Sequence, residues 1–244
     1  MRTFGLQTFT IRKEMKSDFE HAIKTIHEIG IKEIEAARMK IDQQAIDVLK
    51  KYQMNVISLQ MTYHKLMHKK SKIIHFCKEM KTKYVIISVL PLWAHLPLIG
   101  FSLFSKRANQ LIEVYEKQGL NVAFHHHAYE MKRIKDKLRL DHILKSISPK
   151  LGLVIDTYWM TKMNQDPRQI YLKYKKRVIG IHLREYGLNG EHSTIGQGVV
   201  QFKELLNILE EDVYTVIEQK TESAYNDIKE GFTYLEEINE PKTV

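Results

Sequence analysis

The feature that most constrains the fold is an alternation, kept from one end of the chain to the other, of short apolar segments with longer amphipathic ones. The short segments are rich in valine and isoleucine and predict β-strands, whereas the amphipathic segments predict helices. Such an alternation is typical of repeated βα units around a parallel sheet. The predicted strands are residues 3–8, 31–36, 55–60, 84–89, 121–126, 151–156, 178–183 and 214–218.

The amphipathic segments supply one helix after each strand. In residues 18–29 the apolar side chains fall on one helical face, and Ser17 or Asp18 stands where a helix cap is expected. Eight strands alternating with eight helices predict a closed (β/α)₈ TIM barrel rather than an open sheet, and the 244 residues fit one domain spanning the whole chain. The other predicted helices are residues 43–52, 69–80, 105–117, 140–146, 167–174, 202–209 and 224–238.

Charge and cysteine usage limit the classes of partner. The formal net charge of +9 can indicate a nucleic-acid partner, but the lysines alternate with glutamates along the predicted helices. We interpret these lysines as solvated helix faces and expect no nucleic-acid partner. The single cysteine, Cys77, excludes an intramolecular disulfide and fits a reducing compartment. The first residues lack the long apolar stretch of a secretory signal, so the expected location is the cytoplasm.

One uncharged segment, residues 84–104, has the length of a membrane-spanning helix. Pro91, His95 and Pro97 interrupt it, and proline breaks a helix interior. We therefore predict a strand followed by an apolar loop and expect no association with a membrane. Two interpretations of this loop stay open, a lid over a substrate site and the interface of a homodimer.

Several predicted strands end in a residue that can bind a metal ion or transfer a proton. Glu35, His125, Asp156, His182 and Glu218 each follow an apolar residue near a strand end. In a barrel the carboxyl ends of the strands form one rim, where active sites are built, so these side chains are expected to converge.

Strand alternation indicates which of these side chains point inward. Residues two apart share a side of a strand, so Ala123, His125 and His127 are predicted to face the barrel interior. His126 is then directed outward or toward the rim. By the same alternation, the side chains of Asp156, His182 and Glu218 face inward.

Two carboxylates and two imidazoles that converge form a ligand set of nitrogen and oxygen atoms. Such a set suits one Mn²⁺, Co²⁺ or Zn²⁺ ion, and it suits Mg²⁺ less well. The alternative for any single residue is a core or rim side chain with an ordinary hydrogen-bond partner. The predicted metal ligands are His125, Asp156, His182 and Glu218.

The order and spacing of these motifs resemble the xylose isomerase-like TIM barrels, the sugar phosphate isomerase/epimerase family, over nearly the whole chain. His125-His126-His127 is similar to an element of the branch that contains inosose dehydratase. The other motifs that carry the resemblance are Gly5 to Arg12, Ile34-Glu35, Ile155-Asp156-Thr157-Tyr158-Trp159, Asp166-Pro167, His182-Leu183-Arg184-Glu185, Gly196-Gln197-Gly198 and Ile217-Glu218-Gln219.

The resemblance implies metal ligation by Asp156, His182 and Glu218, with His125 at the fourth position. The related epimerases carry a glutamate there and use a pair of glutamates to move a proton between two faces of a ketose. Trp159 stands where those epimerases have histidine. These departures imply a different substrate or a reduced activity.

The resemblance and the ligand set together predict a metal-dependent isomerase or epimerase that acts on a small ketose, sugar phosphate or inosose through an enediolate. Glu218 is the candidate base, and His125 or His127 the candidate acid. Three alternatives remain: an inosose dehydratase-type lyase, a barrel that binds sugar without catalysis, and, more remotely, a DNA repair enzyme similar to endonuclease IV. That last enzyme uses three zinc ions and more ligands than this sequence offers.

Further residues are candidates to bind the substrate. Gln7, Glu35 and His192 are expected to hydrogen-bond sugar hydroxyls, and Arg12 or Arg184 to bind a phosphate. For each there is a structural alternative, since Arg12 can pair with a nearby acid and His192 lies in a polar loop. The predicted substrate-binding residues are Gln7, Arg12, Glu35, Trp159, Arg184 and His192.

Overall fold

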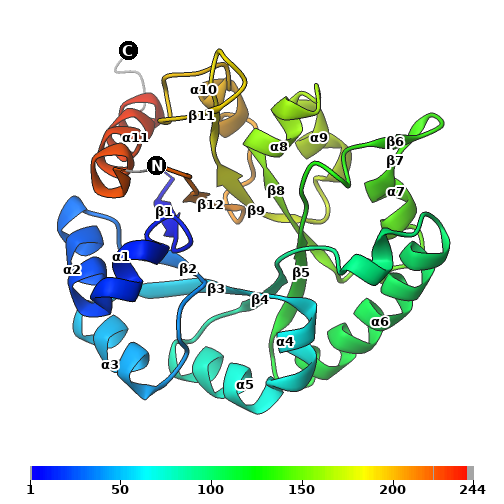
Figure 1. Ribbon diagram of the computed structural model, residues 1–244, viewed down its shortest axis with the longest axis horizontal. Coiled ribbons are helices and arrows are strands. Elements are labelled where there is room, and N and C mark those ends of the chain that lie inside the picture. Colours follow the sequence, from blue (N-terminus) through cyan, green and yellow to red (C-terminus); the bar gives the residue numbers. More distant parts are fainter. Residues whose placement is uncertain (1, 222, 241–244) are drawn as a thin grey trace.

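The computed structural model describes residues 2–221 and 223–240, and within them eight parallel strands close into a barrel (Figure 1). The barrel closes because β1 pairs on one side with β2 and on the other with β12. The predicted (β/α)₈ fold is confirmed. The barrel strands are β1 (Phe4–Gln7), β2 (Glu33–Ala37), β3 (Asn55–Met61), β4 (Tyr84–Ile87), β5 (Asn121–His125), β8 (Gly152–Asp156), β9 (Val178–Leu183) and β12 (Tyr214–Ile217).

Helices surround the barrel and bury their apolar faces against the strands (Figure 1). Asp18 caps the helix that follows it, as the sequence indicates, by accepting a hydrogen bond from the backbone N–H of His21. The helices found where amphipathic segments predict them are α2 (Phe19–Ile29), α3 (Gln43–Lys51), α5 (Lys70–Glu79), α6 (Ile99–Glu116), α7 (Arg139–Leu144), α9 (Pro167–Tyr174), α10 (Phe202–Leu206) and α11 (Ala224–Asn239).

Some short elements lie outside the predicted pattern, in the loops that follow strands. Each of the unpredicted helices has six residues, which gives little helical periodicity, and none continues a longer amphipathic segment of the kind that marks α7 and α10. The unpredicted elements are α1 (Arg12–Ser17), α4 (Tyr63–His68) and α8 (Thr157–Lys162), together with hairpins β6–β7 (Arg133–Ile134, Lys137–Leu138) and β10–β11 (Glu185–Tyr186, His192–Ser193).

The loop predicted for residues 84–104 is shorter than expected, because α6 begins at Ile99 instead of residue 105. Phe101 and Phe104 are buried in the first turns of this helix. Gly100 lies against the 3₁₀ turn Leu92–His95, where an added Cβ would come within 2.7 Å of the Ala94 carbonyl oxygen. The segment is apolar throughout, so no periodicity marked the start of the helix.

The connection from β4 to α6 exposes apolar side chains to solvent. Leu92 is 85% exposed and Ile99 is 77% exposed, and Leu96 and Leu98 are also exposed. A lid and a homodimer interface both remain predictions for this segment. Among the described residues, no helix is long and apolar enough to cross a membrane.

The strand alternation predicted for β5 is confirmed. Val122 and Phe124 belong to the main core between the strands and the helices. Ala123 instead packs with Ile86 and Val154 in a smaller apolar cluster formed by the opposite strand faces, inside the barrel. The residue two positions after Ala123 therefore points into the mouth of the barrel.

Candidate metal centre

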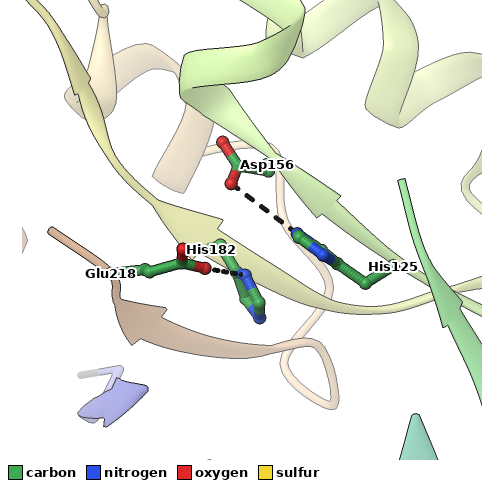
Figure 2. Close-up of side chains that lie close together, drawn as sticks. All are labelled: His125, Asp156, His182 and Glu218. Carbon is green, nitrogen blue, oxygen red and sulfur yellow. Dashed lines mark ion pairs between the residues drawn. The ribbon is translucent and has the colours of Figure 1, made fainter. Parts of the chain in front are cut away.

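Four side chains from separate strands converge at the carboxyl-terminal mouth of the barrel (Figure 2). His125 ends β5, Asp156 ends β8, His182 lies near the end of β9, and Glu218 follows β12. All four residues are buried, and one potential ligand atom from each lies within 4.8 Å of the others. The cluster could hold a metal ion.

Two close contacts join members of this cluster. His182 Nδ1 lies 2.7 Å from Glu218 Oε2, an ion pair when His182 is protonated, and His125 Nε2 lies 3.6 Å from Asp156 Oδ2. Among the described residues, both ring nitrogens of His125 have no hydrogen-bond partner. Buried polar atoms without a partner are costly, and metal coordination would satisfy them. The donor set therefore fits a transition-metal ion that accepts nitrogen and oxygen ligands.

Glu35, on β2, holds the other nitrogen of the His182 ring. His182 Nε2 lies 2.9 Å from Glu35 Oε1. The second oxygen of Glu35 accepts hydrogen bonds from Ser58 Oγ at 2.8 Å and from the Tyr214 hydroxyl at 2.9 Å. With Nε2 occupied in this way, Nδ1 of His182 is the nitrogen that faces the cluster.

Arg184 lies beside the carboxylates of the cluster. Its Nη1 is 3.0 Å from Asp156 Oδ2 and 3.2 Å from Glu218 Oε1. Metal ligation by His182 would require its neutral form, and the three buried carboxylates of Glu35, Asp156 and Glu218 would then face this one guanidinium. The resulting excess of two negative charges equals the charge of a divalent cation, which would compensate the cost of burying it.

The pKa shifts show how strongly this pocket attracts positive charge. Burial acts to lower the pKa of His182, but Glu35 and Glu218 outweigh burial and raise it to about 10. Burial opposes the ionisation of Glu218, yet Arg184 and His182 lower its pKa to about 2. For Asp156 too, burial acts to raise the pKa, but Arg184, His125 and His182 together outweigh burial, so the pKa falls well below its usual range. Both carboxylates are therefore ionised at neutral pH.

The loop after β5 fixes the two histidines that follow His125. His126 Nε2 accepts a hydrogen bond from the backbone N–H of Asp156 at 3.1 Å, so it lies outside the four-residue cluster. The His127 ring lies 4.7 Å from the His125 ring, edge to face. Burial lowers the pKa of His126 to about 4 and that of His127 to about 3. Both side chains are therefore neutral at pH 7.

Trp159 forms part of the wall beside the cluster. Its backbone N–H donates to Asp156 Oδ1 at 3.2 Å, which caps α8. Its ring lies 5.6 Å from that of His127, and its buried indole N–H has no hydrogen-bond partner among the described residues. This N–H is a donor that a bound molecule could use.

His192 approaches the site from the β10–β11 hairpin. Its ring stacks on Tyr158 with centroids 4.2 Å apart, and its Nδ1 is 3.5 Å from Arg184 Nη2. Burial, followed by Arg184 and Lys220, lowers the pKa of His192 to about 4. The structure thus places His192 next to Arg184 instead of leaving it in a solvated loop.

The Glu185 carboxylate explains how this hairpin is held. It accepts hydrogen bonds from the backbone N–H groups of Tyr186, Gly196 and Val200, each at 3.0 Å. An added Cβ at Gly198 would come within 2.5 Å of the Glu185 side chain. The Glu185 and Gly-x-Gly motifs, far apart in the sequence, therefore act together to position the loop that carries His192.

Gln7 ends β1, which lies between β12 and β2 in the barrel, and Arg12 begins α1. Gln7 donates to Gln60 Oε1 at 3.2 Å and accepts from the Phe9 N–H at 2.7 Å. Arg12 donates to the Phe9 carbonyl oxygen at 2.9 Å, and its guanidinium lies 4.0 Å above the Phe9 ring. No contact in the described residues joins Arg12 to the four-residue cluster.

Sequence reasoning did not single out Ser58, Tyr214 or Glu130. Ser58 and Tyr214 hold Glu35, and Glu130 Oε2 accepts the backbone N–H of His127 at 2.7 Å. Ser58 was detectable as a polar residue inside an apolar strand. Tyr214 and Glu130 carry no such signal, because tyrosine is common in strands and glutamate in loops.

Fold and site together define an α/β barrel with a metal-ligand cluster at the carboxyl ends of its strands. The model of the xylose isomerase-like TIM barrel family matches residues 23–238. The chain belongs to this family, so the resemblance inferred from its motifs is confirmed. No significant match was found among curated proteins.

Solved structures with the same fold cover almost the entire chain. A sugar phosphate isomerase/epimerase from Parabacteroides distasonis is 17% identical, with a TM-score of 0.78 and coverage of 96% of this chain and 97% of that one. A probable 3-DHS dehydratase of petrobactin synthesis from Bacillus anthracis is 14% identical, with a TM-score of 0.77 and coverage of 96% and 98%. The 3-keto-D-glucoside 4-epimerase of E. coli is 14% identical, with a TM-score of 0.71 and coverage of 97% and 100%. At these identities the likeness establishes the fold.

Proposed function

We propose that the protein is a metal-dependent isomerase or epimerase of a small sugar-like molecule. The observation that carries this proposal is the convergence of His125, Asp156, His182 and Glu218, in which both ring nitrogens of His125 lack a hydrogen-bond partner among the described residues. These residues would hold one Mn²⁺, Co²⁺ or Zn²⁺ ion. When bound, the ion would act as a Lewis acid toward a carbonyl and a neighbouring hydroxyl of the substrate.

Glu218 is the residue that we propose as the base. Its side chain is 8% exposed, and it is ionised at neutral pH because Arg184 and His182 outweigh burial and lower its pKa to about 2. A carboxylate stabilised to this extent is a weak base, so it suits a substrate C–H that is strongly acidified by a neighbouring carbonyl. Removal of that proton gives an enediolate.

Positioning in the proposed site depends on Glu35 and Arg184. Glu35 holds His182 Nε2, which directs Nδ1 to the cluster. Arg184 fixes one oxygen each of Asp156 and Glu218. These contacts favour a positioning role over the substrate contacts predicted for both residues. Trp159 and His192 remain the proposed contacts to substrate on this side of the mouth.

The histidine at the end of β5 bears on which reaction takes place. With His125 there, the cluster has one glutamate in place of the pair that moves a proton between two faces of a ketose. Isomerisation returns the proton to the neighbouring carbon and needs one base. Epimerisation would need a second proton donor; of the two candidates, His127 is neutral at pH 7 and His125 would be bound to the metal. We therefore favour proton transfer between adjacent carbons.

Loss of water is the second candidate reaction. It also begins with removal of a proton next to a carbonyl, and the proton that Glu218 takes up can return to the departing hydroxyl, which then leaves as water. A probable dehydratase is among the structures with this fold, which supports dehydration as the second candidate reaction. A repair enzyme with three zinc ions fits less well, since the described residues contain one group of converging ligands.

The first experiment is elemental analysis of the purified protein beside the double variant Asp156→Ala, His182→Ala. We expect about one equivalent of metal in the parent and none in the double variant. The control is His75→Ala, Asp136→Ala, which removes the same residue types at exposed positions. A parent that takes up no Mn²⁺, Co²⁺ or Zn²⁺ on reconstitution would contradict the proposal and favour a barrel without catalysis.

The second experiment is a screen of ketoses, ketose phosphates and inososes by mass spectrometry and NMR. Isomerisation and epimerisation conserve the mass of the substrate, whereas dehydration removes one water. Glu218→Gln keeps the size of the side chain and is expected to abolish turnover with the fold intact, because the amide cannot accept the proton. Unchanged turnover would remove Glu218 from the role of base.

A further inference from the structure

A second site lies on the rim at the loops that follow β1, β2 and β3. A cavity of about 670 Å³ there is lined by the basic side chains of Arg12, Lys16, Arg38, Lys40 and Lys65. These residues come from α1, from the connection between β2 and α3, and from α4. Five cationic groups from three separate chain segments thus surround one hollow.

The charge of this cavity is not neutralised by the protein. Asp42 is the acid in its lining, and the Asp42 carboxylate accepts the backbone N–H of Ala45 at the start of α3. Among the described residues, none of the five basic side chains forms an ion pair. Elsewhere exposed lysines do pair, as Lys50 does with Glu79 at 2.6 Å. Like charges held together without counterions favour the binding of an anion.

Arg38 adds a feature of the backbone. Its φ is +55°, in the left-handed region that residues with a side chain rarely adopt. This conformation costs roughly 1–2 kcal/mol, and five other described residues that are not glycine share it. It turns the chain directly after β2, where Arg38 and Lys40 line the same cavity.

The cavity lies across the barrel mouth from the metal-ligand cluster. In the barrel, β1, β2 and β3 are consecutive neighbours, and the cluster residues come from β5, β8, β9 and β12. Figure 1 shows α1, α3 and α4 on one side of the barrel and α8 on the other. A smaller cavity, lined by Gln60 together with Arg38 and Lys65, lies between the basic cavity and the Gln7–Gln60 hydrogen bond.

We propose that this cavity binds the phosphate group of a small molecule. A phosphate dianion matches the forked donors of Arg12 and Arg38 and the point charges of the lysines. The volume exceeds that of a phosphate, and Met15 and Phe19 supply apolar lining for the rest of a ligand. The inference is independent of the proposed function, because none of the metal-cluster residues takes part.

The test is a calorimetric titration of the purified protein with inorganic phosphate, D-fructose 6-phosphate and D-fructose. The double variant Arg38→Gln, Lys65→Gln removes two exposed cations of the cavity, and the control Lys117→Gln, Lys176→Gln removes two exposed cations elsewhere. We expect the cavity variant to bind both phosphates roughly tenfold more weakly or worse, since charged hydrogen bonds are lost, and the control to match the parent.

The outcomes separate the sources of the phosphate group. Tighter binding of fructose 6-phosphate than of phosphate would identify a phosphorylated small molecule, and equal binding would identify free phosphate. No saturable binding by the parent, or equal losses in both double variants, would overturn the proposal. A short single-stranded DNA that binds more tightly than fructose 6-phosphate, and weakens in the cavity variant, would replace it with a nucleic-acid surface. Each result leaves the metal-centre proposal testable on its own.

Discussion

Replacing Glu130 by glutamine should stabilise the protein at pH 8 and leave its stability unchanged at pH 4. Glu130 is 1% exposed, and its carboxylate accepts the backbone N–H of His127 in the loop that follows His125. Burial raises the pKa of Glu130 from 4.5 to about 7, although the hydrogen bond from His127 and the charge of Arg139 oppose this rise. The ionised form is therefore disfavoured in the folded protein.

The sign and size of the effect follow from proton linkage. Between pH 4.5 and 7 the unfolded chain loses the proton of Glu130 while the folded protein keeps it, so stability falls as pH rises. At about 1.36 kcal/mol per pH unit, that interval corresponds to about 3 kcal/mol. Glutamine is neutral throughout, and its amide oxygen can accept the same N–H. The expected gain at pH 8 is thus about 3 kcal/mol, or roughly 6–12 °C in Tm.

Chemical denaturation of parent and variant at several pH values between 4 and 8 would measure this difference. The control is Glu113→Gln, at an exposed position of α6, which should show no such trend. A difference in the free energy of unfolding that does not change with pH, or a variant that is less stable at pH 8, would refute the reasoning. A stabilised variant would show that the loop beside the metal cluster is held at a cost in stability.

Two further predictions concern residues that position the site. Glu35→Gln should weaken metal binding by roughly tenfold or more in calorimetry, because the partner of His182 Nε2 loses its charge. Tyr214→Phe, which removes one donor to Glu35, should have a smaller effect. Equal metal affinities in the parent and both variants would contradict a positioning role for Glu35. Gly198→Ala should cost about 1–3 kcal/mol in urea unfolding, because the new Cβ meets the Tyr186 carbonyl oxygen at 2.4 Å and the Glu185 side chain at 2.5 Å. A loss below about 0.5 kcal/mol, the usual range of neutral surface changes, would show that the loop adjusts freely.

The fold was predictable because its signal is distributed along the chain. Each strand is a short apolar run, and inward and outward positions alternate along it. Both the position of β5 in the chain and the inward direction of the His125 side chain could therefore be predicted from the sequence. Elements whose residues are uniformly apolar or few in number carry no periodicity. This is why the first turns of α6 and the whole of α1 were missed.

The sequence predicted that the four residues of the cluster converge, but it did not predict which side chains contact them. A parallel barrel sends every strand end to one rim, so His125 and Asp156 must approach each other whatever the loops do. The partners of Arg184 and Glu35 depend instead on side-chain direction across several strands. Arg184 was expected to bind substrate phosphate, and the structure places it 3.0 Å from Asp156. An arginine in a sequence does not reveal which anion it faces.

The two proposed sites differ in charge, and this difference would determine how a substrate binds across the mouth. The metal-ligand cluster and its neighbour Glu35 together contain three buried carboxylates, whereas the cavity beside Arg38 contains five basic side chains and one acid. When a divalent ion offsets the excess negative charge of the cluster, a phosphate placed there would meet little net charge, whereas the same phosphate near Arg38 would meet five cations and one acid. A sugar phosphate would therefore bind with its hydroxyl and carbonyl groups toward the cluster and its phosphate toward the basic cavity.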